Sequence, residues 1–293
     1  MLIVFNPAAG QRQRWRLDGL LAALATRGVT AEVQATRQAG EATELARAAA
    51  RAGVPLVIAA GGDGTVAEVV NGLLDGPVEA KPPALGIVPL GTANVLAQEL
   101  AIPRAPAALA DLLTSGTTRP LWSGVLEHGQ QQRYFVQMVG AGFDACVVHG
   151  VNGGLKRLVG GFAYGWQGLV EAGRYGFPRI DVVIDGVPMT THGIIVTKGR
   201  LYAGRFTLAS EASPFERGFT AVLFDRPGAL SALAFGLALP LGQVARLPGI
   251  RWLPAREVQV LAGKAPVQVD GDPLADSAFA VRTSSRSLDV LAP

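Results

Sequence analysis

The sequence predicts an α/β domain followed by a β-rich domain, and two patterns along the chain indicate this fold class. Over the first 120 residues, short apolar runs alternate with segments whose apolar residues recur at helical spacing. After Pro120, short strand-like runs follow one another with turn residues between them. The first pattern is typical of a parallel sheet with helices on both faces, and the second of a mostly antiparallel sheet.

The first domain, residues 1–120, is expected to alternate strands with helices. The expected strands are residues 2–5, 29–36, 56–60 and 84–90. The expected helices contain Leu17 to Leu24, residues 41–53, Val66 to Leu73, residues 93–100 and residues 106–114. Gly28 and Gly53 provide the stop signals of the first two helices.

The second domain, residues 121–281, is expected to consist mainly of strands. The expected strands of the second pattern are residues 134–142, 180–186, 192–198, 219–224, 258–263, 266–272 and 287–291. Helical stretches are expected near residues 155–174 and 228–240. Cys146 lies in a strand-like apolar run and is expected in the core.

The composition narrows the function classes. The chain has 26 basic and 23 acidic residues, and its net charge of +3 permits an anionic ligand or a membrane surface without calling for nucleic acid. The single cysteine excludes an internal disulfide and a multi-cysteine zinc site. The first residues lack the basic region of a signal peptide, and the longest apolar stretch, residues 229–242, is too short to span a bilayer. A cytoplasmic protein is therefore expected.

A glycine-rich loop, Gly-Gly-Asp-Gly-Thr at residues 61–65, follows the apolar run 56–60. Glycines let backbone N–H groups approach an anion, and ligands of parallel sheets bind where strands end and helices begin. Thr65 and Glu68 have capping-box spacing, which predicts a helix that begins at Thr65 and offers free N–H groups to a phosphate. Asp63 would repel a bare phosphate, so a magnesium ion between the two is expected. The alternative is a tight turn with a solvated Asp63.

Two other nucleotide motifs are not supported. The chain contains no Gly-x-x-x-x-Gly-Lys-[Ser/Thr] loop. Residues 140–145, Gly-Ala-Gly-Phe-Asp-Ala, match a loose dinucleotide pattern, but no clear strand with an acidic residue follows at the expected distance. We therefore do not expect an NAD site there. Serine hydrolase chemistry is not expected either, because the chain has no Gly-x-Ser-x-Gly elbow.

Five segments in order resemble the diacylglycerol kinase catalytic family, which includes bacterial lipid kinases and is similar to sphingosine and ceramide kinases. The segments are VFNPAAG (4–10), GGDGTVAEVVNGL (61–73), PLGTANVLAQEL (89–100), GAGFDA (140–145) and VQVDGDPL (267–274). The resemblance implies a two-domain, NAD kinase/diacylglycerol kinase-like fold with ATP in the cleft between the domains. It implies a Rossmann-like three-layer α/β domain and a β-sandwich-like domain, with a last strand near 282–293 that returns to the first domain.

The resemblance also implies the site residues. The residues that would line the nucleotide are Asn6, Thr36, Gly61, Gly62, Asp63, Gly64, Thr65, Val66, Ala67 and Thr92. Asp63 would lie close to the phosphates and the magnesium ion, and Asp272 would accept the proton of the lipid hydroxyl. Phosphoryl transfer needs such a charge clamp and a positioned base. By itself, the Asp-Gly pair at 270–271 indicates only a hairpin turn.

Three positions depart from the family pattern. Asp272 stands where the family has Glu, so its shorter side chain has to recover reach. Val95 stands where many relatives have Asp, which removes a polar contact. Arg217 stands where bacterial lipid kinases often have Asp, so a second, structural cation site is in doubt.

The expected function is transfer of the ATP γ-phosphate to a lipid hydroxyl, with diacylglycerol or a related lipid as acceptor. The alternatives are a NAD kinase-like enzyme and a nucleotide-binding regulator that has lost activity. The lipid would be met in a peripheral, transient contact with the inner face of the membrane, and a homodimer stays open. Residues 155–176 are interpreted as an interfacial helix or a packed one, and residues 229–242 as the lining of an acyl pocket or a core helix.

Overall fold

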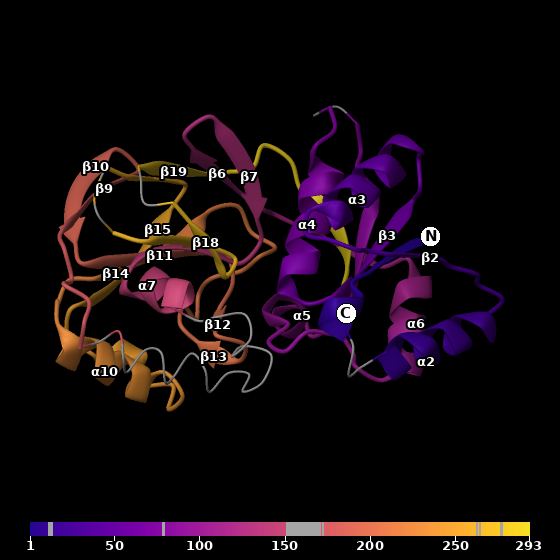
Figure 1. Cartoon of the computed structure of the whole chain (residues 1–293), viewed down its shortest axis with the longest axis horizontal. Coiled ribbons are helices and arrows are strands. Elements are labelled where there is room, and N and C mark those ends of the chain that lie inside the picture. Colours follow the sequence, from indigo (N-terminus) through magenta and orange to yellow (C-terminus); the bar gives the residue numbers. More distant parts are fainter. Residues whose placement is uncertain are drawn as a thin grey trace. The chain divides into compact units, whose positions relative to one another are not determined.

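The chain folds into two compact units. The computed structural model describes residues 1–10, 14–77, 80–150, 171, 173–261, 263, 265–275 and 278–293. Unit 1 consists of Met1–Trp122 with Ser285–Pro293, and unit 2 of Ser123–Ser284. Figure 1 shows the elements of both units along the chain.

Unit 1 is built around a six-stranded sheet with the strand order β2-β1-β3-β4-β20-β5. Its strands are β1 (Leu2–Phe5), β2 (Glu32–Ala35), β3 (Leu56–Gly61), β4 (Ala84–Pro89), β5 (Thr118–Leu121) and β20 (Leu288–Leu291). The first four strands are parallel, β20 runs parallel to β4, and β5 runs antiparallel to β20. The strand expected near the end of the chain therefore lies in the sheet of unit 1. The buried residues of β1, β3 and β4 explain their uninterrupted apolar runs.

Helices cover both faces of this sheet. They are α1 (Pro7–Gly10), α2 (Arg14–Ala25), α3 (Glu41–Arg51), α4 (Asp63–Leu74), α5 (Val95–Glu99) and α6 (Pro106–Ser115). Helices α3 and α4 pack against each other, and α2 packs against α6 on the other side of the sheet (Figure 1). This arrangement confirms the three-layer α/β architecture predicted from the alternating pattern.

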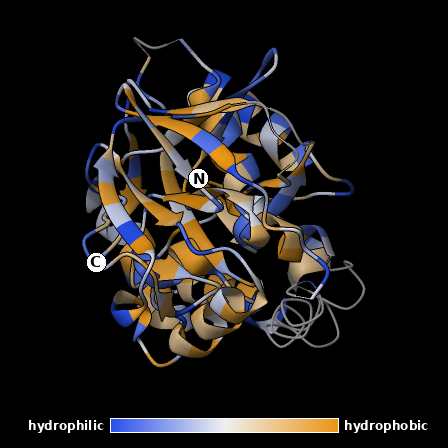
Figure 2. Cartoon of the chain, turned by 90° about the vertical axis from the view of Figure 1, so that its left-hand side faces the viewer, coloured by the Kyte–Doolittle hydropathy of each residue, from blue (hydrophilic) through white to orange (hydrophobic). Residues whose placement is uncertain are grey.

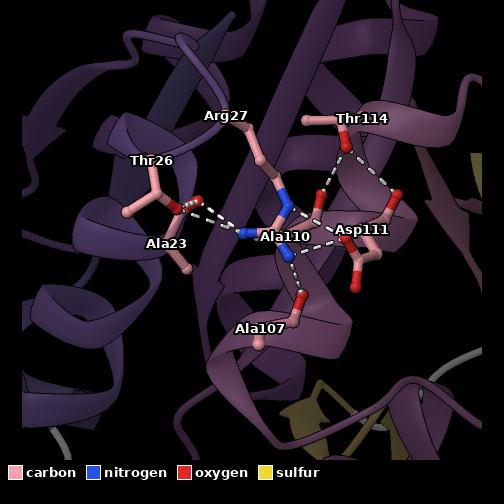
Figure 3. A network of polar contacts seen from close by, with 7 residues as sticks. All are labelled: Ala23, Thr26, Arg27, Ala107, Ala110, Asp111 and Thr114. Carbon is pink, nitrogen blue, oxygen red and sulfur yellow. Dashed lines mark hydrogen bonds and ion pairs between the residues drawn. The ribbon is translucent and has the colours of Figure 1, made fainter.

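Arg27, just after the end of α2, connects this helix to α6 (Figure 3). Its guanidinium donates to both Ala23 O (2.7 Å) and Ala107 O (3.2 Å). Its Nε and Nη2 atoms also donate to Asp111 Oδ1, at 2.8 and 2.6 Å. Arg27 therefore ties together two helices that are far apart in the sequence, through the charge-assisted hydrogen bonds that a planar guanidinium makes best.

Unit 2 contains two six-stranded antiparallel sheets, in the orders β10-β9-β16-β19-β6-β7 and β15-β14-β11-β8-β17-β18. The strands of the first sheet are β6 (Gly124–His128), β7 (Gln131–Phe135), β9 (Ile180–Ile184), β10 (Val187–Thr191), β16 (Glu257–Val260) and β19 (Phe279–Thr283). The strands of the second sheet are β8 (Met138–Gly142), β11 (Gly193–Thr197), β14 (Phe219–Phe224), β15 (Ile250–Ala255), β17 (Val267–Val269) and β18 (Asp272–Leu274). A short pair, β12 (Leu201–Tyr202) and β13 (Phe206–Thr207), accompanies them.

The second sheet of unit 2 has apolar residues on both faces. Ile194 and Val196 of β11 lie in the core between the two sheets. Ile195 points the other way, into a second apolar cluster that also contains Ala238 of α10 (Ala229–Ala238). Alternation of side chains along a strand explains why β11 is apolar throughout, since both of its faces are covered. The predicted β-sandwich-like domain is confirmed.

Three details of the second domain differ from the expectations. Residues 134–142 form two strands rather than one, because the carboxylate of Asp270 accepts the backbone N–H groups of Val136, Gln137 and Met138 and interrupts the strand. Cys146 lies in helix α7 (Phe143–Gly150), is only half-buried, and donates its thiol to Glu171 Oε2 (3.3 Å). The helix expected near 155–174 lies mostly outside the described residues, whereas the one expected near 228–240 is confirmed as α10.

Candidate functional site

The glycine-rich loop lies at the carboxyl edge of the parallel sheet in unit 1. Strand β3 ends at Gly61 and α4 begins at Asp63, with Gly62 as its extended N-cap residue. At the same edge, Asn6 follows β1 and donates its backbone N–H to Ala60 O (2.9 Å), and Thr36 follows β2. Parallel strands bind ligands at this edge. The predicted residues Asn6, Thr36 and 61–67 therefore share one edge of one sheet.

The predicted start of α4 at Thr65, with a capping box, is wrong. The helix begins at Asp63, and Thr65 is buried inside its first turn, where its Oγ1 accepts a hydrogen bond from Asn6 Nδ2 (3.1 Å). Glu68 Oε2 instead accepts the backbone N–H of Ala42 at the start of α3 (3.2 Å). The side chains that would have made a cap are used to connect neighbouring elements. The helix geometry leaves the N–H groups of its first turn without intrahelical acceptors.

Two glycines of the site are explained by close contacts. A Cβ atom on Gly61 would lie 2.3 Å from Thr65 Oγ1, and one on Gly91 would lie 2.5 Å from the Cα of Gly62. The loop after β3 and the loop after β4 therefore touch through their backbones. Gly64 differs, because it is exposed and a Cβ there would meet no heavy atom within 4 Å. Packing in the described structure does not explain this third glycine, whereas the approach of a ligand would.

Asp63 and Asn94 hold the two loops in place. Asp63 Oδ1 accepts the backbone N–H of Leu96 in the first turn of α5 (3.4 Å). Asn94 is buried at a positive φ of 48°, and its side-chain amide brackets Gly91, with distances of 2.9 Å to the N–H and 2.7 Å to the carbonyl. Asn94 was missed as a site residue, although it stands inside the recognised Gly-Thr-Ala-Asn segment. Thr92 is exposed between these residues, and Val95 is buried.

Asp272 lies in unit 2, on β18. Its carboxylate is half-exposed and forms an ion pair with Arg133, with Nη2 and Oδ2 2.7 Å apart. Asp270 and Gly271, which precede it, have positive φ values of 48° and 84° and form the two-residue turn between β17 and β18. The hairpin expected from Asp-Gly alone is therefore present, and its first residue after the turn is Asp272.

Asp270 fixes this hairpin through hydrogen bonds to the backbone between β7 and β8. Its side chain is buried and accepts the N–H groups of Val136 (3.1 Å), Gln137 (3.0 Å) and Met138 (3.0 Å). Burial raises the pKa of Asp270 to about 6, against the opposing effect of the three N–H groups and of Arg133. The positions of this carboxylate and of Asp272 are therefore coupled through one turn and one arginine. Sequence reasoning gave Asp270 no role, because the three N–H groups are more than 130 residues away.

An apolar cavity of about 300 Å³ lies in unit 2. Its wall includes Phe143 of α7, Ile194 of β11 and Phe235 of α10. Asp144 is the carboxylate in this wall; it accepts hydrogen bonds from the Tyr202 hydroxyl and from Gln268 Nε2 (2.9 Å). Burial raises the pKa of Asp144 above its usual range.

A chain of hydrogen bonds joins this cavity to the hairpin. Gln268 donates to Asp144 and accepts the backbone N–H of Gly271 on its Oε1 (2.9 Å). The Gly-Ala-Gly-Phe-Asp-Ala segment now has a structural explanation, because a Cβ on Gly140 would lie 2.4 Å from Asp144 Oδ2. The first glycine of the segment therefore makes room for the cavity carboxylate.

Lys198 holds the segment that contains Arg217. It is buried, and its ammonium donates to Glu216 O and Gly218 O, both at 2.7 Å. Its Nζ also lies 5.4 Å from the centre of the Phe219 ring. Burial lowers the pKa of Lys198 to about 8. The carbonyls of Glu216 and Gly218, on either side of Arg217, therefore bind the ammonium group of Lys198. Arg217 is the position at which the sequence put a second, structural cation site in doubt.

Two family models match the chain in succession. The model described as diacylglycerol kinase catalytic domain matches residues 1–126, and that described as YegS C-terminal NAD kinase beta sandwich-like domain matches residues 137–292. The chain belongs to the bacterial diacylglycerol kinase and YegS-like lipid kinase family. This is a family of ATP-dependent kinases, so the resemblance stated from the five sequence segments is confirmed.

Relatives of this family align with the chain to different extents. A probable lipid kinase YegS-like of Chromohalobacter salexigens is 39% identical over 143 residues, 49% of this chain and 44% of the relative. A diacylglycerol kinase of Bacillus subtilis is 35% identical over 186 residues, 63% of this chain and 59% of the relative. The chain thus spans about half the length of these curated relatives. A diacylglycerol kinase of Staphylococcus carnosus is 26% identical over 92% of this chain and 87% of its own.

The fold is also shared with a solved structure. A crystal structure of a diacylglycerol kinase from Bacillus anthracis superposes with a TM-score of 0.74, at 20% identity, covering this whole chain and 96% of the other. At this identity the likeness shows that the two chains share a fold.

Few side chains among the described residues are candidate ligands for a metal ion. Among them, no cluster of three or more His, Cys, Asp or Glu side chains is suited to a metal. Asp63 fits as a single hard oxygen ligand, because its half-buried carboxylate lies beside the first turn of α4. Within the same part of the chain, no helix is both long and apolar enough to cross a bilayer.

Proposed function

We propose that this protein is an ATP- and magnesium-dependent kinase that phosphorylates a lipid hydroxyl, with diacylglycerol as the first candidate acceptor. The observation that carries the proposal is the hydrogen-bond chain from Asp144 through Gln268 to Gly271. It connects an apolar cavity, which suits a lipid tail, to the hairpin that presents Asp272, which suits a proton acceptor. Family membership supports phosphoryl transfer as the reaction.

Unit 1 would bind the nucleotide. The first turn of α4 presents N–H groups that have no acceptor within the helix, and these groups and the positive end of the helix dipole favour phosphate. Gly64 leaves space above them. Asn6, Thr36 and Thr92 line the same edge of the sheet and would contact the rest of the nucleotide. Magnesium, held by Asp63, would neutralise charge on the phosphates. The chain's part is to position the phosphates and to keep Asp63 directed by its contact with the Leu96 N–H.

Asp272 would accept the proton of the lipid hydroxyl as the hydroxyl oxygen attacks the γ-phosphorus and ADP leaves. The carboxylate is half-exposed, so a substrate can reach it. Arg133 Nη2 donates a hydrogen bond to Asp272 Oδ2 (2.7 Å), which fixes the direction of the carboxylate. Asp270 and Gln268 hold the turn at 270–271 and so fix the backbone from which Asp272 projects. Such a base contributes about a hundredfold to ten-thousandfold to the rate.

The cavity size bears on the acceptor. At about 300 Å³ it lies at the small end of ligand pockets, so it would take part of one acyl chain and leave the rest of the lipid outside. This favours a lipid that stays in its bilayer during transfer. The protein would then act in a transient, peripheral contact at the inner face of the membrane. A NAD kinase-like activity is less well supported, since the cavity of unit 2 is mainly apolar.

The test is phosphate transfer by the purified full chain from radiolabelled ATP. Acceptors are diacylglycerol, ceramide, sphingosine and NAD, each with and without magnesium. We expect labelled diacylglycerol only when magnesium is present, and no labelled NAD. ATP binding without transfer to any acceptor would instead support the regulator alternative.

The Asp272→Asn variant tests the proton acceptor. We expect transfer to fall by about a hundredfold or more with ATP binding retained, because the amide cannot take up the proton. Asp181→Asn, on the exposed face of β9, is the matched control and should transfer at the wild-type rate. Wild-type transfer by Asp272→Asn would remove this residue as the base.

A further inference from the structure

Helix α10 is apolar around its whole circumference although it lies at the surface. Among residues 229–239, Ser231 is the only one with a polar side chain. Yet Leu230 is 84% exposed, Leu237 is 72% exposed, and Leu241, in the turn that follows, is 69% exposed. Figure 2 turns this side of the molecule toward the viewer, with α10 near the lower edge in the orange and tan of apolar residues. A helix that is apolar on all sides is normally buried or in contact with lipid.

The two sides of α10 have different surroundings. Ala238 and Leu239 are buried in the cluster that contains Ile195, so this side is explained by packing. Leu230 and Leu237 are seven residues apart, which places them two turns apart on one face. That face does not contribute to the core of the described structure. Several large apolar side chains in one exposed row are typical of an interaction surface rather than of scattered surface residues.

The segment that contains α10 is basic. Residues 226–256 contain Arg226, Arg246, Arg251 and Arg256 and no Asp or Glu. Arg226 and Arg246 are exposed and flank α10 at its two ends, whereas Arg251 pairs with Asp225 (3.0 Å). Leucines between arginines suit an anionic bilayer, in which the leucines enter the acyl region and the arginines meet lipid phosphates. The same charge disfavours a second copy of this chain, because the arginines of both copies would meet.

The exposed row also reaches the cavity. Leu230 and Arg226 belong to its wall, together with Ser231, Ala234 and Phe235 of α10. One side of the helix therefore lines the cavity while its exposed leucines continue from the cavity rim across the surface.

We propose that α10 docks the protein on the surface of an anionic bilayer, with Leu230, Leu237 and Leu241 inserted and with Arg226 and Arg246 at the headgroups. The cavity rim then opens toward the lipid, and an acyl chain can enter without crossing water. The passage of a substrate lipid rests on the function proposed above, whereas the docking itself does not.

The test is co-sedimentation of the full chain with vesicles, without ATP. One set is phosphatidylcholine alone, and the other is phosphatidylcholine with an equal part of phosphatidylglycerol. The main variant is Leu237→Glu/Leu241→Glu, because neither residue lines the cavity, and Leu237→Gln/Leu241→Gln removes the apolar contact without adding charge. Val187→Glu, at a 52% exposed site on β10, is the matched control. Thermal unfolding of each variant checks that it is folded.

We expect the wild type and Val187→Glu to bind the anionic vesicles, and both double variants to bind about tenfold more weakly or worse. Arg246→Gln should weaken binding to the anionic vesicles and reduce its salt dependence, with little change on phosphatidylcholine alone. Absence of wild-type binding, or equal binding by all variants, would overturn the proposal. So would a wild-type dimer that becomes a monomer in the double variants while vesicle binding is unchanged.

A second assay separates this proposal from the kinase function. Transfer to a water-soluble short-chain diacylglycerol does not require a bilayer, so the double variants should retain it. Vesicle binding that depends on the leucines, with no transfer to any lipid, would support docking and contradict the kinase. Transfer to both short-chain and bilayer lipid by all variants alike would support the kinase and contradict docking.

Discussion

The two units carry their candidate site residues in different ways. In unit 1, the loop at 61–65 offers backbone N–H groups that all belong to one short motif, although distant residues such as Asn6 and Leu96 hold it in place. In unit 2, the proposed chemistry depends on side chains from distant segments, because Asp144 and Gln268 are 124 residues apart and Arg133 and Asp272 are 139 apart. A backbone site is visible as a sequence motif, whereas a side-chain network is visible only after folding.

The largest expected effect separates two glycines of the backbone site. In Gly61→Ala, the new Cβ would overlap Thr65 Oγ1, so we expect unit 1 to lose about 3 kcal/mol of unfolding free energy and ATP binding to be lost with it. In Gly64→Ala, the Cβ enters open space inside a helix, so stability should stay the same or rise by about 0.5–1 kcal/mol while ATP binding weakens.

Denaturant unfolding and ATP titration of both glycine variants measure this difference. If Gly64→Ala binds ATP as the wild type does, the glycine does not serve the phosphates, and the comparison between the two units loses its basis.

A pH series tests the buried side chain of the other unit. The pKa of Asp270 is raised to about 6, so the stability that its protonated form contributes is complete below about pH 4 and is lost as pH rises through 6. Relative to Asp270→Asn, which does not titrate, the wild type should lose about 3 kcal/mol between these pH values. Urea unfolding of both proteins at several pH values measures the difference. A constant difference over this range would show that Asp270 is ionised at acid pH as well.

The smallest of these effects concerns the link between the cavity and the hairpin. In Asp144→Asn the shape of the side chain is kept, but one of its acceptors for Tyr202 or Gln268 becomes a donor. We expect kcat/KM for the lipid to fall by about tenfold with ATP binding unchanged. Asp185→Asn, in the β9–β10 turn, controls for the loss of one carboxylate in unit 2. An equal fall in ATP binding would mean that Asp144 acts on the whole protein rather than on the lipid site.

Much of the fold could be predicted from local pattern. The parallel strands of unit 1 are short apolar runs, and helices such as α3 and α6 show clear apolar periodicity, so each was predicted close to its observed bounds. Unit 2 was harder. Strands β10 and β15 were missed; each contains a proline, Pro188 and Pro254, and a proline argues against a strand. Residues 134–142 were predicted as one strand, because nothing local indicates that Asp270 will occupy three of their N–H groups.

The sequence by itself determined the alternation of strands and helices in unit 1, the glycine loop at the end of β3 and the family to which the chain belongs, because these depend on residues that are adjacent or a few positions apart. Only the tertiary structure decided that α4 begins at Asp63, that Asp270 holds the hairpin, and that Asp144 and Gln268 connect a cavity to Asp272. The physical reason is that a buried polar group must find a partner wherever the fold brings one, and those partners are more than a hundred residues away.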